Sequence, residues 1–524
     1  MEERDVEPHV HTPFFRQNGN IVAFMEKFLN YRSTDDRGVD QSAATQQGED
    51  DSSKSGHCRL YVVGLATLVC SATTANAFAF TYSSVLGSPQ EISSITSHSI
   101  DPRTDMILPR SPVMGVLYGA SPVGSILGIL TSLFISRKLS IRYQVMICLI
   151  LSALPTLLIP IAFDMETNQR VPIIAVLRFV QGLGSSVMVP LMINLAHQWT
   201  AEEEATLVLA LVSSQAQIGV MITSLTAGLL GNTFGWRTIC NLSAVYTAII
   251  FALWSTFYFD VPSMYCCCLG EKEKELLSKD ERPRASISPF RLKNTLAVFG
   301  EMMRNLSVWA VLVAAFGSYG GISPLFLFQT SILKRSLKLT NEETCIVACI
   351  SCLLHLVIKA LGCLFYFKGY GSGNWRTKAV NFAACALTGC VFAIVASNYY
   401  EGKYARAGLF ALAQALSGFS YSGYHCASNI VAKRFSMIIL SIFITMSIFT
   451  SMIEPALIAF YFPDHKWDEW RLLIFLHGIL LIPSNVFYFL VADAPPRLNR
   501  KDLPVRQNSD MEMVERPPPN EFAD

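Results

Sequence analysis

Residues 178–199 read RFVQGLGSSVMVPLMINLAHQW, an apolar run that begins with an arginine. A run of about 20 apolar residues crosses a bilayer as a helix. An arginine within such a run is costly unless it faces protein or water. Gln181, Gly182 and Ser185 recur at helical spacing from Arg178, and this polar stripe predicts a helix face that lines a cavity. A guanidinium that snorkels to the outer headgroups is the alternative.

Composition predicts the same class of protein for the whole chain. Of its 524 residues, 51% are hydrophobic and 15% charged, and the net charge is +1. These values indicate an all-α, multi-pass integral membrane protein, and they leave open whether it resides in the plasma membrane or an intracellular vesicle. About twelve runs are long enough to span a bilayer, and they lie near 60–83, 112–135, 143–163, 172–196, 206–230, 238–259, 308–329, 345–367, 379–397, 405–430, 435–461 and 471–492.

The runs divide into two six-helix halves, as expected for two repeats related by an axis along the membrane normal. The loops at 136–143, 260–305 and 368–378 are rich in Lys and Arg and fall on one side, which predicts that this side and both chain ends are cytoplasmic. The predicted parts are a disordered tail (1–57), the first half (58–260), a linker (261–305), the second half (306–495) and a second disordered tail (496–524).

Polar stripes recur in the first, fourth, seventh and tenth spans, as a cavity between two symmetric halves requires. The tenth is the richest, with ALSGFSYSGYHCASN at 415–429, although hydrogen bonding between helices is the alternative explanation. In the seventh, glycines predict a bend that serves gating. The polar residues of the tenth and seventh spans are Ser417, Ser420, Tyr421, Tyr424, His425 and Ser428, then Ser318, Tyr319 and Ser323.

Four further ionisable residues fall well inside predicted spans, away from the ends of the runs. Glu454 lies at a depth similar to that of Arg178 but in the other half, where a carboxylate can carry a coupling proton, pair with a cation or snorkel outward. His355 and Lys359 are one turn apart in the eighth span, and His477 is in the twelfth. We interpret the histidines as packing residues.

Several function classes find no support in the sequence. No phosphate-binding loop of the form GxxxxGK[ST], dinucleotide fingerprint or HExxH motif is present. Most of the fourteen cysteines fall inside predicted spans and form no zinc-site pattern. We therefore expect no enzyme activity, catalytic residues, metal site, cofactor or nucleic-acid partner.

Several stretches resemble the major facilitator superfamily and, within it, solute-carrier family 17, whose members carry organic anions and phosphate. Residues 178–199 are similar to the family's fourth-span pattern R-x-x-Q-G-x-x-E-G followed by proline and tryptophan. AGLLGNTFGW, LSVWAVLVAAF, LLHLVIK and SGFSYSGYHCASNIVAKRFS are similar to parts of the fifth, seventh, eighth and tenth spans. The resemblance runs from about residue 58 to 495 and implies twelve helices that work by alternating access.

The chain departs from the family where the family carries charge or histidine. Thr74 replaces the first-span arginine, Ser185 the fourth-span glutamate, Ile193 the fourth-span histidine and Ser318 a seventh-span arginine. Arg178 matches the family's anion-contacting arginine, but its usual acidic partner is missing.

These observations predict a secondary active transporter of a small organic anion or phosphate, and the family resemblance implies coupling to protons or sodium. The expected substrate-binding residues are Arg178, Gln181, Tyr421, Tyr424, His425 and Ser318, with Glu454 as the coupling residue. Two alternatives stay open: a transport-inactive receptor or scaffold on the same fold, and a carrier of a neutral metabolite. The partners are then a small anionic substrate, a coupling ion and the bilayer.

Overall fold

The computed structural model describes residues 48–86, 112–135, 139–186, 205–260, 303–367, 374–397, 402–424, 436–461 and 467–492, with a few isolated positions between these ranges. Within them all regular structure is helical. The first half of the chain forms α2 (Gly48–Leu86), α4 (Pro112–Ile135), α5 (Ile141–Ala162), α6 (Thr167–Ser185), α8 (Ala205–Val212), α9 (Gln215–Phe234) and α10 (Arg237–Phe257).

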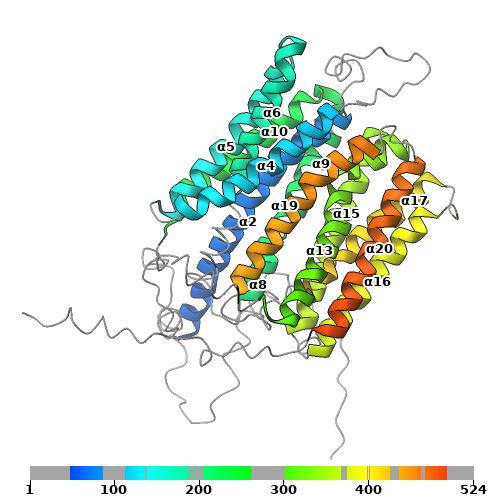
Figure 1. The fold of residues 1–524 in the computed structure, drawn as a ribbon. Helices are drawn as coiled ribbons and strands as arrows, with labels where there is room; N and C mark the ends of the chain where they lie inside the picture. The colour runs from blue at the N-terminus through cyan, green and yellow to red at the C-terminus, as the bar shows by residue number, and fades with distance from the viewer. Residues whose placement is uncertain are drawn as a thin grey trace, which may run out of the picture.

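The second half forms a similar series of helices. It consists of α13 (Leu306–Leu327), α14 (Gln329–Ser331), the π-helical turn η3 (Ile332–Ser336), α15 (Asn341–Phe367), α16 (Asn374–Ala396), α17 (Lys403–Leu416), the 3₁₀ segment η4 (Ser417–Ser422), α19 (Ser436–Tyr461) and α20 (Trp467–Val491). Figure 1 shows the two groups side by side, with blue and cyan helices in one and most of the yellow to red helices in the other.

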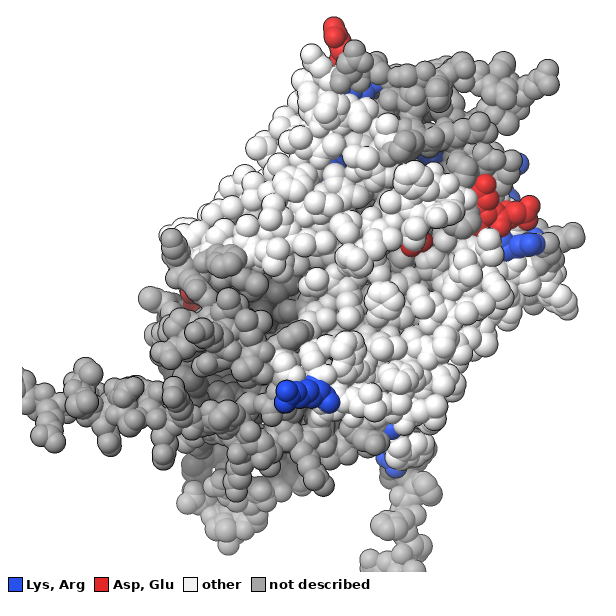
Figure 2. Space-filling view, in the orientation of Figure 1, with Lys and Arg blue, Asp and Glu red and all other residues white. Residues whose placement is uncertain are grey.

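Nine helices in the described residues are long and apolar enough to cross a membrane. The other three predicted spans fall on α6, on α8 with α9, and on α17 with η4, where the described segments are shorter or less apolar. Figure 2 shows one face of the molecule, where uncharged residues cover most of the helical body and charged ones gather near its ends. The prediction of an all-α, multi-pass membrane protein is confirmed.

The predicted tails and linker fall mostly outside the described residues, so their boundaries stay predictions. At one of them the structure differs from the expectation. α2 begins at Gly48, so helix extends into the stretch 1–57 that was predicted to be a disordered tail.

Each half is held together by its own helix pairs, and two seams join the halves. α4 and α5 pack on α6 in the first half, while α13 and α16 pack on α20 in the second. One seam pairs α4 with α19, and the other pairs α9 with α15. At the predicted outer end, Arg335 of η3 also donates a hydrogen bond to the Ser84 carbonyl of α2 (3.2 Å). Burial lowers the pKa of this guanidinium from its ordinary value.

The glycines of the seventh span have a packing role. α13 is unbroken from Leu306 to Leu327, so the glycines do not interrupt the helix, and the predicted bend stays a prediction. A Cβ at Gly317 would overlap the Ser484 side chain, and one at Gly321 would lie 3.0 Å from the His477 carbonyl oxygen. These glycines let α13 approach α20 closely, a common use of small residues between membrane helices.

Candidate functional site

Arg178 lies on α6, where it joins three helices of the first half. Its side chain is buried, with an exposed fraction of 2%. Nη1 donates to the Ala77 carbonyl of α2 (3.1 Å) and to Oε1 of Gln181, and Nε donates to the Leu117 carbonyl of α4 (3.4 Å). The guanidinium is thus held by neutral acceptors, and no carboxylate in the described part of the chain pairs with it.

An aromatic side chain covers the Arg178 guanidinium. The Phe80 ring of α2 lies 4.7 Å from the guanidinium carbon, a cation–π distance. Phe80 contacts Tyr118 of α4 edge to face, with ring centroids 5.7 Å apart. This burial excludes the predicted alternative of a side chain that snorkels to the headgroups in this conformation.

Gln181 connects Arg178 to a polar network inside the first half. Its Nε2 donates to the Asn76 carbonyl (2.8 Å) and to the Thr156 hydroxyl (2.6 Å). The Asn76 side chain in turn donates to the hydroxyls of Ser152 on α5 (3.0 Å) and Thr247 on α10 (2.8 Å). The i, i+3 relation between Arg178 and Gln181 therefore places both on one face, as the sequence pattern predicts.

The predicted residues of the second half lie apart from this network. Ser318 of α13 is buried with its hydroxyl 3.9 Å from the Cys385 sulfur. Tyr424 is buried against Tyr319 and Phe443, with ring centroids 6.3 and 5.5 Å away. The Tyr421 side chain and all of His425 lie outside the described residues.

The polar stripe of the tenth span is not one face of a regular α-helix. α17 ends at Leu416, and Ser417–Ser422 form a 3₁₀ segment instead. Ser417 contacts Nδ1 of His355 on α15 (3.2 Å), which also lies 3.0 Å from the Gln414 carbonyl. At this serine the alternative reading, hydrogen bonding between helices, describes the structure better than a cavity wall.

Glu454 of α19 forms a buried pair with His477 of α20. Its Oε1 lies 3.1 Å from Nε2 of His477, and both side chains are about one-tenth exposed. The angles are not those of a hydrogen bond, so Oε1 accepts none within the described residues. On the other side of the ring, Nδ1 lies 2.7 Å from the Leu473 carbonyl. The sequence allows Glu454 to pair with a cation but does not identify His477 as the partner, and the interpretation of His477 as a packing residue alone is incomplete.

A cavity of about 710 Å³ lies elsewhere, between the start of α2, the α8–α9 connection, the end of α10 and the end of α15. None of the predicted site residues lines it. Its one lysine is Lys359, a residue that the sequence marked as buried but did not connect to a site. Its position inside a predicted span was the one sign in the sequence that Lys359 could belong to a site. The sequence did not show which helices meet around it.

Most of the chain matches a known protein family. Residues 60–436 match the family model described as Major Facilitator Superfamily. Human sialin is 23% identical over 344 residues, which cover 65% of this chain and 67% of sialin. Mouse sodium-dependent phosphate transport protein 3 is 21% identical over 383 residues, 72% of this chain and 78% of that protein.

Solved structures share the fold at low sequence identity. The D-xylose-proton symporter superposes with a TM-score of 0.60 at 11% identity and covers 83% of this chain and 98% of its own. A bacterial homologue of the human lysosomal transporter Spinster, in an inward-facing conformation, gives 0.56 at 13% identity and covers 83% and 97%. The expected twelve-helix arrangement in two halves is thereby confirmed, and this chain belongs to the Major Facilitator Superfamily, as a divergent member similar to solute-carrier family 17.

Proposed function

We propose that this protein is a secondary transporter that carries a small organic anion or phosphate by alternating access, with Arg178 as the group that contacts the anion. One observation carries the proposal. Arg178 is a buried cation whose hydrogen-bond partners are all neutral, and its Nη2 donates no hydrogen bond within the described residues. The relatives support the anion class, because one of them is named as a sodium-dependent phosphate transport protein.

Nη2 gives Arg178 the chemistry that an oxyanion needs. A guanidinium offers five N–H donors in a planar fork that matches two oxygens of a carboxylate or phosphate. Here Nε and Nη1 are used by the protein, whereas both donors of Nη2 are left for a ligand. Phe80 covers one face of the guanidinium, whereas the N–H donors lie along its edge, where an oxyanion can reach them.

The first test is uptake by purified protein in proteoliposomes. We expect inorganic phosphate or a small carboxylate such as lactate to enter, and glucose and choline to be excluded, because a buried cation favours an anionic ligand. Uptake of glucose instead would support a carrier of neutral metabolites. Binding of anions without any uptake would support the receptor alternative.

That receptor alternative has a structural observation in its favour. At two positions where the family carries charge, this chain forms neutral hydrogen bonds: Thr74 donates to Gln215, and Ser185 pairs with Ser125 (2.6 Å between hydroxyl oxygens). Neutral hydrogen bonds at these positions maintain the packing of the helices but cannot bind or release a coupling ion, as expected for a receptor that does not transport. The uptake experiment decides between the two functions.

We further propose that Glu454 carries the coupling proton, paired with His477. Oε1 of Glu454 lies 3.1 Å from Nε2 of His477 and accepts no hydrogen bond within the described residues, so a proton can pass between the two groups. The pair is adjacent to the seam between the halves, because a Cβ at Gly115 of α4 would lie 3.4 Å from the Pro455 carbonyl. Its protonation state can therefore bias how the halves pack.

Glu454→Gln is expected to uncouple transport without abolishing it. The amide keeps the size of the side chain but cannot release a proton, so accumulation driven by a pH gradient should fall at least about tenfold while exchange of labelled for unlabelled anion continues. The matched control is Glu343→Gln, because Glu343 is a surface carboxylate near Lys403 (3.8 Å). Unchanged gradient-driven accumulation in Glu454→Gln would remove Glu454 from coupling.

A further inference from the structure

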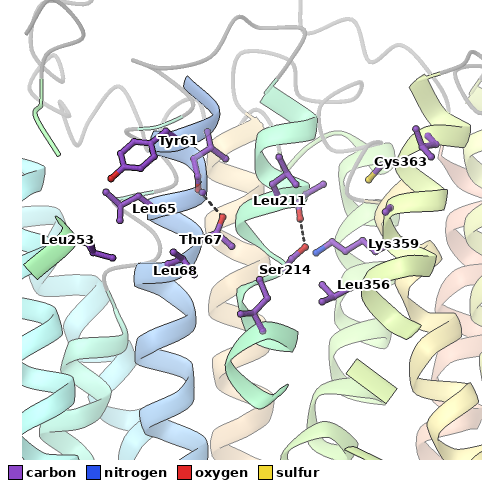
Figure 3. Close-up of a pocket in the computed structure, with 16 residues that line it drawn as sticks. Tyr61, Leu65, Thr67, Leu68, Leu211, Ser214, Leu253, Leu356, Lys359 and Cys363 are labelled. Atoms are coloured by element: carbon purple, nitrogen blue, oxygen red, sulfur yellow. Dashed lines mark hydrogen bonds between the residues drawn. The ribbon is translucent and has the colours of Figure 1, made fainter. Parts of the chain in front are cut away.

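The cavity at the predicted cytoplasmic end differs in character from the surroundings of Arg178. Its walls come from both halves, with α2, α8, α9 and α10 on one side and α15 on the other. In Figure 3, Lys359 extends from α15 toward Ser214 at the α8–α9 connection, and Tyr61, Leu65 and Leu68 of α2 lie across from it. The volume of about 710 Å³ is in the range that holds a small-molecule ligand.

Almost all of the lining is apolar, and two of its three hydroxyl groups already donate a hydrogen bond. Thr67 donates to the Val63 carbonyl of its own helix (2.8 Å), and Ser214 donates to the Ala210 carbonyl (3.0 Å). The remaining walls are mostly leucine, valine, alanine and isoleucine side chains. A ligand that fits these walls presents an uncharged, apolar body with few hydrogen-bonding groups.

Lys359 supplies the charged end of the cavity. Its side chain is buried, with an exposed fraction of 2%, and Nζ donates to the Ser213 hydroxyl (2.7 Å). Ser213 in turn donates to the Ala210 carbonyl, so its oxygen is directed at the ammonium group. A carboxylate bound beside this amine favours its ammonium form and attracts it strongly, because little water is there to screen the interaction.

We infer that this cavity is a second ligand site, separate from Arg178, that binds an amphipathic monocarboxylate with its carboxylate on Lys359 and its apolar body against α2 and α10. Phosphate and other strongly hydrated anions do not suit it, because beyond Lys359 and the Tyr61 hydroxyl the lining offers almost no donors to replace their water. The Lys359–Ser213 hydrogen bond joins the two halves, so a carboxylate that takes the ammonium loosens this link. The bound ligand then favours the arrangement in which the cavity is open.

A pair of matched probes tests the carboxylate. We expect 2-naphthoate to bind the purified protein in nanodiscs, measured by naphthalene fluorescence, and 2-naphthamide, which has the same shape without the charge, to bind far more weakly. Lys359→Met removes the ammonium and keeps the length of the side chain, so the Kd for naphthoate should rise roughly 10- to 100-fold. Lys334→Met removes a lysine of η3 that does not line the cavity and should leave the Kd unchanged.

A second variant tests the cavity without touching the charge. Gly64 lines the cavity, and a Cβ there meets no atom within 4 Å, so Gly64→Leu should fill the space without disturbing packing. We expect this variant to fold and to lose naphthoate binding. The inference is overturned if naphthamide binds as tightly as naphthoate, or if Gly64→Leu binds naphthoate like the wild type. Neither outcome depends on whether Lys359→Met folds.

This inference can fail independently of the proposed transport function. Phosphate uptake and naphthoate binding are measured in separate experiments with different ligands. Naphthoate binding without phosphate uptake refutes only the transport proposal. Phosphate uptake without naphthoate binding refutes only the second site.

Discussion

Arg178→Ala is expected to abolish anion uptake in proteoliposomes and to lower the stability of the protein. Two charge-assisted hydrogen bonds from Nη2 to an oxyanion are worth roughly 1.5–3 kcal/mol each, so the affinity should fall at least about 100-fold. The truncation also leaves Oε1 of Gln181 without its donor inside the bundle. Each buried acceptor left without a partner costs about 1–3 kcal/mol of unfolding free energy.

Two further variants separate the role in binding from the role in packing. Arg178→Lys keeps the charge but lacks the planar fork, so we expect the protein to fold and uptake to fall by about tenfold or more. Arg237→Ala is the matched control, because Arg237 is an exposed arginine whose pair with Asp164 (2.7 Å) contributes little to stability. Uptake is measured per amount of monodisperse protein. Wild-type uptake by a folded Arg178→Ala variant would exclude this residue from the anion site.

Much of the fold was predictable because bilayer length and apolar composition constrain it so strongly. Runs such as 143–163 and 471–492 predicted α5 and α20 to within a few residues. Breaks inside runs were not predictable from the same signal. The change from α17 to 3₁₀ geometry at Ser417 coincides with a close approach to α15, where a Cβ added at Gly418 would lie 2.7 Å from the His355 carbonyl oxygen. Hydropathy contains no information about such contacts.

In the candidate site, too, contacts within one helix were predictable and contacts between distant helices were not. Helical spacing predicted that Arg178 and Gln181 share a face, because that relation depends only on α6. The ring of Phe80 over Arg178, the contact of Glu454 with His477 and the bond from Lys359 to Ser213 each join helices that are distant in sequence. From the sequence each of these was only a polar or aromatic residue in an apolar run. The three-dimensional packing supplies the partner.

Gly182→Ala is expected to prevent correct packing of the first half. α4 and α6 cross so closely that a Cβ at Gly182 would overlap the Ser121 carbonyl, and one at Gly124 would overlap the Phe179 carbonyl. Both obstacles are backbone atoms, so no side-chain rotation can relieve the overlap and the helices must separate. We expect a loss of about 3 kcal/mol in unfolding free energy, at the upper end for overpacking. Arg178 is one turn away, so anion binding should weaken as well.

The control for this prediction is another glycine-to-alanine change in a helix. Gly408 lies exposed in α17, and a Cβ there meets no atom within 4 Å. Gly408→Ala should therefore be neutral or stabilise the helix by about 0.5–1 kcal/mol, because alanine loses less conformational entropy on folding than glycine. Yield of monodisperse protein and the thermal unfolding midpoint measure both variants. Equal midpoints would mean that α4 and α6 can separate at no cost, in which case Arg178 does not depend on their close approach for its position.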